Sequence, residues 1–177
     1  LKFIIMENKP TAPWLIAIII SLGFILFNLV LLITDQLTNK YMSWVSSAIL
    51  VIVIIWACIH YAKQMNGDVT FGNVFGHGFK VTAGIAAIMS VYTFIAFKFI
   101  HPEIIEKTID IARAEMEKKP ELNAEAIDMG LNMTRKFFIP FALAGSLFGT
   151  AFVGLIASLL GAAFARKNPS TPFENAG

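Results

Sequence analysis

Four long apolar stretches dominate the pattern of hydrophobic and polar positions along the chain. The only charges they carry are lysines near their ends, and none has the polar face of a helix on a soluble core. The hydrocarbon core of a bilayer is about 30 Å thick and needs about 20 apolar residues of helix. The pattern therefore predicts an all-α integral membrane protein, a single domain with four transmembrane helices. The predicted spans cover about residues 12–34, 42–63, 79–100 and 138–165.

The polar segment before the third span also has a helical pattern. A turn signal at Gly67 is followed by phenylalanines at helical spacing on one face, while Asn73, His77 and Lys80 share another face. We therefore expect a short interfacial amphipathic helix before the third span. Its three glycines each lower helix stability by about 1 kcal/mol relative to alanine, so either packing compensates or the segment is partly unwound.

Residues 101–136, between the third and fourth spans, carry two narrow apolar stripes at helical spacing. The first follows Pro102, which suits the first turn of a helix, and the second follows Pro120. We expect an amphipathic helical hairpin that stands on one face of the membrane. The polar tail, residues 168–177, contains two prolines and is expected to be disordered.

The last span is unusually rich in glycine, alanine and serine. Small residues recur at intervals of four at Gly145 and Gly149, and again at Gly154 and Ser158, a pattern that lets helix backbones approach closely. Asn28 is the one strongly polar side chain deep in a span, and it is a further candidate for helix packing through hydrogen bonds. The pattern leaves open whether these residues pack within the chain or against a second copy.

Composition and charge narrow the class further. Charged residues make up 15% of the chain, whereas soluble domains have about 25%, and the mean hydropathy is +0.69. The net charge of +2 predicts no nucleic-acid partner, because such a partner needs a concentrated basic patch. Cys58 is the single cysteine, so a disulfide within the chain and a CxxC motif are excluded. No cleavable signal is evident before the first span, and because Met6 is the more natural start of translation, no role is expected for residues 1–5.

Candidate chemistry is sparse. His60, His77 and His101 match no metal-binding spacing and fall at predicted interfaces on two sides of the membrane, so no metal or other cofactor is predicted. The chain is not expected to be an enzyme, since it has no nucleophile elbow, no phosphate-binding loop and no paired carboxylates at membrane depth. Asn73, His77 and Lys80 are the candidate contact for a lipid, an anion or a partner, because a lysine beside hydrogen-bonding groups at headgroup depth suits a phosphate. The alternative is a solvated face with a snorkelling lysine.

The expected orientation follows from the number of spans and from the loops. An even number of spans puts both termini on one side of the membrane. Lysine and arginine near the span ends are divided almost evenly between the two sides. We expect the termini in the cytoplasm, because long acidic segments such as residues 101–136 are the ones usually translocated.

Short motifs around the third span carry a family resemblance. Thr70-Phe71-Gly72 and Gly78-Phe79-Lys80 precede this span, and Phe97-Lys98-Phe99-Ile100-His101-Pro102-Glu103 follows it. Over residues 12–167 the chain resembles a family of small four-span membrane proteins, domain of unknown function 4199, found mainly in Bacteroidota. It departs from the family's pattern in the longer spacing between its glycines. The resemblance implies a four-span architecture in the bacterial inner membrane and carries no assigned activity.

Two functional hypotheses remain. The leading one is a non-enzymatic accessory or scaffold subunit of a larger envelope complex in the inner membrane, acting through helix–helix contacts. It rests on the small residues of the last span, on the absence of catalytic or ion-coupling residues and on the predicted hairpin. The alternative is a small protein that handles or transports a lipid-linked substrate through the Asn73, His77 and Lys80 face. The expected partners are membrane lipid and either other integral membrane proteins or a second copy of the chain.

Overall fold

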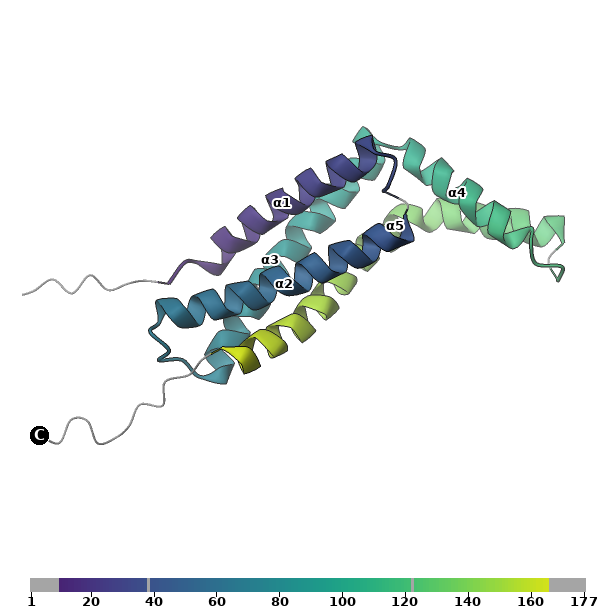
Figure 1. Ribbon diagram of the computed structural model, residues 1–177. Helices are drawn as coiled ribbons and strands as arrows, with labels where there is room; N and C mark the ends of the chain where they lie inside the picture. Colours follow the sequence, from purple (N-terminus) through teal and green to yellow (C-terminus); the bar gives the residue numbers. More distant parts are fainter. Residues whose placement is uncertain (1–9, 38, 122, 166–177) are drawn as a thin grey trace, which may run out of the picture.

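The computed structural model describes residues 10–37, 39–121 and 123–165, and over these residues it contains helices and no β-strand (Figure 1). A π-helical turn, η1, continues the third helix. The elements are α1 (Pro13–Ile33), α2 (Lys40–Gln64), α3 (Phe71–Ile95), η1 (Ala96–Ile100), α4 (Glu103–Met116) and α5 (Ala124–Phe164). The predicted all-α fold is confirmed. The tail that was predicted to be disordered, residues 168–177, lies outside the described residues.

Four of the helices are long and apolar enough to cross a membrane, namely α1, α2, α3 with η1, and α5. This number agrees with the four predicted spans. Their outward surfaces carry large exposed apolar side chains such as Trp14, Leu26, Ile52 and Phe152. Such a surface is unfavourable in water and suits contact with lipid chains. Helix α1 begins and α5 ends at the same end of the bundle, as an even number of spans requires (Figure 1).

Helix α3 begins at Phe71 and runs without a break into the membrane span. The short interfacial helix predicted before the third span is therefore not a separate element. Thr70 caps the new helix, because its side-chain oxygen accepts a hydrogen bond from the backbone N–H of Asn73 at 3.2 Å. Val74 and Gly78 in the next turns are buried. Burial at these positions compensates for the low helix propensity of the glycines, which explains why the helix starts so early.

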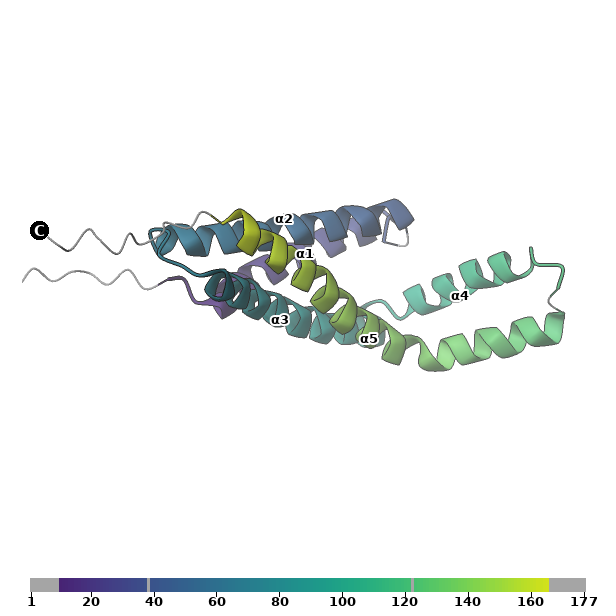
Figure 2. The same ribbon diagram turned by 90° about the horizontal axis from the view of Figure 1, so that it is seen from below.

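Helix α5 has 41 residues, and at a rise of 1.5 Å per residue its length of about 62 Å far exceeds the bilayer core. Its first part projects beyond the bundle and lies beside α4 in antiparallel orientation (Figure 2). Ile109, Ile127 and Leu131 are buried between the two. The hairpin predicted for residues 101–136 therefore has one arm of its own, α4, while the other arm is the start of the last membrane helix.

Pro140 lies inside α5 and not at the start of a helix, although the sequence placed the beginning of the last span near residue 138. Proline has no backbone N–H, and its ring crowds the carbonyl group one turn earlier, so it bends a helix that continues through it. Figure 2 shows that α5 changes direction between its first and second parts. The bend allows the first part to follow α4 while the second part crosses the bundle.

Helix α3 is the central helix, and it packs against α1, α2 and α5. Small residues mark the places where the backbones come closest. A Cβ atom added to Gly154 would lie 2.1 Å from Cγ2 of Thr82, and one added to Gly78 would lie 2.4 Å from Sγ of Cys58. Backbones can approach this closely only where no Cβ intervenes. Glycines of both α3 and α5 therefore set the spacing of the bundle.

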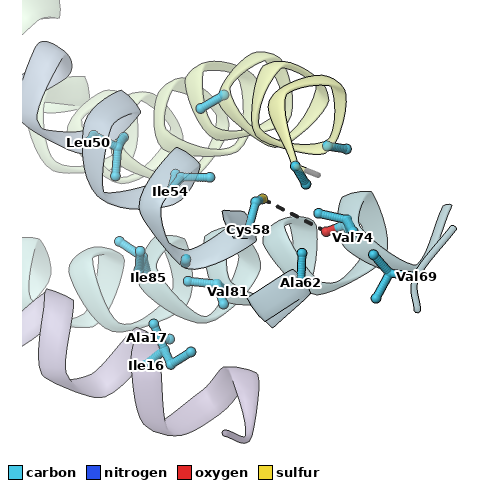
Figure 3. Close-up of a cluster of buried hydrophobic side chains, with 14 residues drawn as sticks. Ile16, Ala17, Leu50, Ile54, Cys58, Ala62, Val69, Val74, Val81 and Ile85 are labelled. Carbon is cyan, nitrogen blue, oxygen red and sulfur yellow. Dashed lines mark hydrogen bonds between the residues drawn. The ribbon is translucent and has the colours of Figure 1, made fainter. Parts of the chain in front are cut away.

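Buried apolar side chains of the membrane helices surround these contacts (Figure 3). Cys58 of α2 is fully buried, and its Sγ atom lies 3.8 Å from the carbonyl oxygen of Val74 on α3. On the other side of α3, Ala17 of α1 is also fully buried, and a Cβ atom added to Gly84 would lie 2.7 Å from its Cβ. The lone cysteine is thus part of the packed core.

Candidate functional site

Three helix ends meet at the end of the bundle where α1 begins, α2 ends and α3 begins (Figure 1). Thr11, just before α1, and Gln64, the last residue of α2, share two hydrogen bonds. The backbone N–H of Thr11 donates to Oε1 of Gln64 at 2.9 Å, and Nε2 of Gln64 donates to Oγ1 of Thr11 at 2.7 Å. This pair fixes the start of α1 against the end of α2.

A tight turn brings α3 back against α2. Asn66 and Gly67 have φ angles of 53° and 78°, in the left-handed region that favours asparagine and glycine. The turn lets Tyr61 of α2 stack on His77 of α3, with ring centroids 4.3 Å apart and an angle of 15° between the planes. The stack holds the imidazole in a fixed place between the two helices.

A cavity of about 340 Å³ lies where these elements meet, and Asn73, His77 and Lys80 all line it. The sequence placed these three residues on one helical face, and the structure brings them to one cavity together with Thr11 and Tyr61. Asn73 and Lys80 are exposed, whereas only 7% of His77 is accessible. The face formed by these three residues is therefore not evenly solvated, because His77 is buried while Asn73 and Lys80 are exposed.

The imidazole of His77 has an incomplete set of hydrogen bonds. Its Nε2 atom is buried and has no hydrogen-bond partner among the described residues. Leaving a buried polar group without a partner costs about 1–3 kcal/mol, so such a group in a folded chain needs an explanation. A ligand atom in the adjoining cavity is one way to offset this cost.

The charges around the cavity favour an anion. Pro13 in the first turn of α1 and Gly72 in the first turn of α3 both line it, and a helix N-terminus carries about half a positive charge. Lys80 adds a full positive charge. None of the lining residues within the described part of the chain is acidic. Two helix N-termini and a lysine thus face one small space, an arrangement that binds carboxylate or phosphate groups.

The residues predicted to pack helices behave differently from one another. Gly154 lies against Thr82, and Ser158 is buried with its hydroxyl group donating to the carbonyl oxygen of Gly154 at 2.7 Å. Gly145 and Gly149 are exposed, and nothing in the described chain lies within 4 Å of a Cβ atom built on either. Close approach of another helix is therefore found at Gly154, while no described residue of another helix comes into contact distance at Gly145 or Gly149.

Asn28 makes its hydrogen bond within its own helix. Its Nδ2 atom donates to the carbonyl oxygen of Phe24 at 2.9 Å, one turn earlier in α1. No hydrogen bond from this side chain to another helix is found among the described residues. Its amide oxygen is left as an acceptor.

Sequence reasoning missed the contributions of Thr11, Gln64 and Tyr61 to the cavity. Thr11 and Gln64 are 53 residues apart, and no local pattern indicates that they pair. Tyr61 lies near the end of the predicted span 42–63, and no local pattern links it to His77. The turn signal at Gly67 is consistent with α2 and α3 being antiparallel neighbours. Predicting that Tyr61 stacks on His77 would also require knowing which faces of the two helices meet.

Metal ligands do not gather in the described part of the chain, where no group of three His, Cys, Asp or Glu side chains is placed to hold an ion. The three histidines are dispersed. His60 stacks on Trp56 at 5.0 Å, His77 stacks on Tyr61, and His101 lies 2.9 Å from a carboxylate oxygen of Glu103.

Comparison with known proteins gives a family and no function. Residues 14–167 match the family described as Protein of unknown function (DUF4199). No curated protein and no solved structure matches the chain. The matched segment includes the helices from the second residue of α1 onward and six of the nine residues that line the cavity, while Pro10, Thr11 and Pro13 precede it.

Proposed function

The chain belongs to the family described as Protein of unknown function (DUF4199), and from this premise we propose a function based on the geometry of its residues. The protein is a non-enzymatic, multi-pass protein of the bacterial inner membrane that binds the anionic headgroup of a lipid or lipid-linked molecule. The binding site is the cavity lined by Asn73, His77 and Lys80. The observation that carries the proposal is the meeting of these three side chains with two helix N-termini in a space whose described lining contains no acid.

Each group has a distinct part in binding. The ammonium group of Lys80 attracts the headgroup, and an exposed lysine at an anionic membrane surface contributes about 1 kcal/mol. The amide of Asn73 and the imidazole of His77 give direction, because hydrogen bonds to an ionised oxygen are shorter and stronger than those between neutral groups. The stack on Tyr61 fixes the imidazole before the ligand arrives, which lowers the entropy lost on binding.

The surface beside the cavity suits the hydrocarbon part of a lipid. Phe71, Phe75 and Phe79 follow one face of α3, with successive ring centroids 6.4 Å and 6.0 Å apart. Phe71 and Phe79 are about two-fifths exposed. A headgroup in the cavity would leave its acyl chains next to this aromatic face, so the polar and apolar parts of one molecule have adjacent places.

The proposed orientation puts this cavity on the cytoplasmic side. Helix α1 begins and α5 ends at one end of the bundle (Figure 1), and residues at the start of α1 and of α3 line the cavity at that end. Cytoplasmic termini therefore bring the cavity to the cytoplasmic leaflet. That leaflet carries the negative surface potential that attracts lysines. Lys63, at the end of α2, lies at the same end of the bundle.

Lipid analysis of purified variants tests the proposal. Native mass spectrometry of the full chain in mild detergent should find anionic phospholipid bound to the wild-type protein. Lys80→Gln should lower the bound fraction several-fold, and Lys80→Gln with Asn73→Ala should lower it further. Both side chains are exposed, so the fold should survive. Lys98→Gln is the matched control, because Lys98 lies near the opposite end of the same span. Equal lipid content in the double variant and the control would refute the proposal.

A second candidate function is favoured by the projecting arm of α4 and α5. This arm extends beyond the bundle (Figure 2), and its outer surface exposes Met129 and Met133 among charged side chains. An accessory subunit that docks another integral membrane protein, or a second copy of the chain, would use such a surface. Stoichiometric copurification of a protein that is lost on changing Met129 and Met133 to glutamine would support this function, while loss of lipid alone would favour the first.

A further inference from the structure

Two adjoining cavities lie between the helices at the opposite end of the bundle from the headgroup site. The first measures about 380 Å³ and is lined by residues of α1, α2, α3 and α5. The second measures about 410 Å³ and lies between α1, α3, η1, α4 and α5. Both are lined by Asn28, Leu37 and Met89. A molecule that passes Asn28 would therefore reach both.

Glycines of α5 open the first cavity. Gly145 and Gly149 line it, and nothing lies within 4 Å of a Cβ atom built on either. Each glycine makes a helix less stable than alanine would, and here no close helix contact compensates. At Gly154, further along α5, the missing Cβ admits Thr82 of α3. The first two glycines thus provide space between helices, whereas the third provides contact.

The polar side chains that line the first cavity are all uncharged, and they are amide and hydroxyl groups. The amide nitrogen of Asn28 is used within α1, and the hydroxyl groups of Ser46 and Ser47 donate to carbonyl oxygens of their own helix at 2.9 Å and 3.0 Å. What remains on these three side chains is oxygen lone pairs and the second N–H of the Asn28 amide. They would recognise a molecule that brings O–H or N–H donors.

The second cavity is mainly apolar and aromatic. Leu32, Ile104 and Phe138 are among the residues that line it, and Phe138 packs edge-on against Phe97 at 5.2 Å. No Asp, Glu, Lys or Arg side chain is among the described residues that line either cavity. His101 lines the second cavity, and its Nδ1 atom lies 2.9 Å from a carboxylate oxygen of Glu103. An ionised headgroup would be buried here without a free countercharge, which is costly.

We propose that this pair of cavities binds an uncharged lipid with a hydroxylated head. The hydroxyl groups donate to Asn28 and the serines of α2 in the first cavity, and the acyl chain occupies the second. The site differs from the headgroup site in place, at the other end of the bundle, and in charge. It would give the protein one site for an anionic lipid and one for a neutral lipid.

Photolabelling with two matched probes tests the charge preference. One probe is a monoacylglycerol with a diazirine in its acyl chain, and the other is the lysophosphatidic acid with the same chain. Each is added to the full-length protein in mild detergent, and labelled peptides are mapped by mass spectrometry. The monoacylglycerol should label segments of α1, α4 and α5 that line the cavities, and the charged probe should label them far less. Equal labelling by both probes, or no labelling by the neutral one, would overturn the proposal.

Substitutions that fill the cavity test its place. Gly149→Leu and Gly145→Leu put a side chain into the cavity, and each should reduce labelling by the neutral probe to background. Gly23→Leu is the matched control, because this glycine of α1 also has nothing within 4 Å of a built Cβ and lines neither cavity. Asn28→Leu should weaken labelling about fivefold, the weight of one hydrogen bond. Wild-type labelling in both α5 variants, with thermal unfolding unchanged, would place the lipid elsewhere.

Discussion

Glycine has two different roles along a single helix, and the structure separates them residue by residue. Gly154 and Gly161 of α5 are buried, and a Cβ atom on either would lie within 3 Å of Thr82 or Cys58. Gly145 and Gly149 have no such neighbours. The sequence shows the same spacing of small residues at Gly145 and Gly149 as at Gly154 and Ser158. The position of the facing helix decides whether a glycine packs against that helix or leaves a space between the helices.

This difference predicts opposite effects of the same substitution. Gly154→Ala should destabilise the bundle by about 1–3 kcal/mol, because the added methyl group overpacks Thr82. Gly149→Ala should be neutral or should stabilise the helix by up to about 1 kcal/mol, since alanine is the better helix former and nothing obstructs it. Thermal unfolding in detergent, followed by circular dichroism, measures both. A Gly149→Ala variant that melts below Gly154→Ala would contradict this assignment.

The helices themselves show which parts of the fold can be predicted from sequence. Long apolar runs locate the spans, because the bilayer imposes their length. The ends of the helices are less predictable. Helix α3 starts well before its apolar run because Thr70 caps it and Val74 is buried. Helix α5 continues through Pro140 because its first part is held against α4. Both extensions depend on tertiary contacts that a local pattern does not contain.

The arm formed by α4 and the start of α5 should be held by its apolar contact more than by its ion pairs. Ile109→Ala should destabilise the arm by about 2–5 kcal/mol, because a buried side chain leaves a cavity. Arg113→Gln, which removes an exposed ion pair with Asp128, should cost less than about 1 kcal/mol. Hydrogen exchange of the amides in α4 reports both changes.

The central membrane bundle provides the control for that measurement. Amides of α3 near Val81 and Ile85, which are buried in the separate core between the spans, should keep their protection in both variants. If Ile109→Ala instead accelerated exchange throughout α3, the arm and the bundle would form one cooperative unit, contrary to this account.

At the scale of the whole molecule, the candidate site was only partly predictable. Helical spacing alone put Asn73, His77 and Lys80 on one face. The burial of His77 and its stack on Tyr61 depend on how α2 packs against α3. The cavity also depends on the hydrogen bonds between Thr11 and Gln64. These contacts bring together residues of α2, of α3 and of the segment before α1, so no single segment of the sequence contains them.

The orientation of the molecule can be tested by chemical labelling. The native Cys58 is fully buried and should not react, so single cysteines can be added at exposed positions. Glu121→Cys, beyond α4, should react with an impermeant maleimide in intact cells, because the arm is expected on the periplasmic side. Asp68→Cys, in the turn before α3, should react only after the membrane is permeabilised. The reverse result would mean that the membrane orientation is opposite, with the proposed headgroup site in the periplasmic leaflet.

The central claim, that the cavity at the start of α3 binds an anionic headgroup, is tested most directly at His77. The full-length protein with ¹⁵N-labelled histidine is placed in phosphatidylcholine nanodiscs, and phosphatidylglycerol is added in steps. The ring-nitrogen resonances of His77 should shift and saturate, those of His60 and His101 should not follow the same curve, and Lys80→Gln should weaken the response several-fold. Resonances of His77 that stay unchanged, or that shift equally in the Lys80→Gln variant, would contradict the claim.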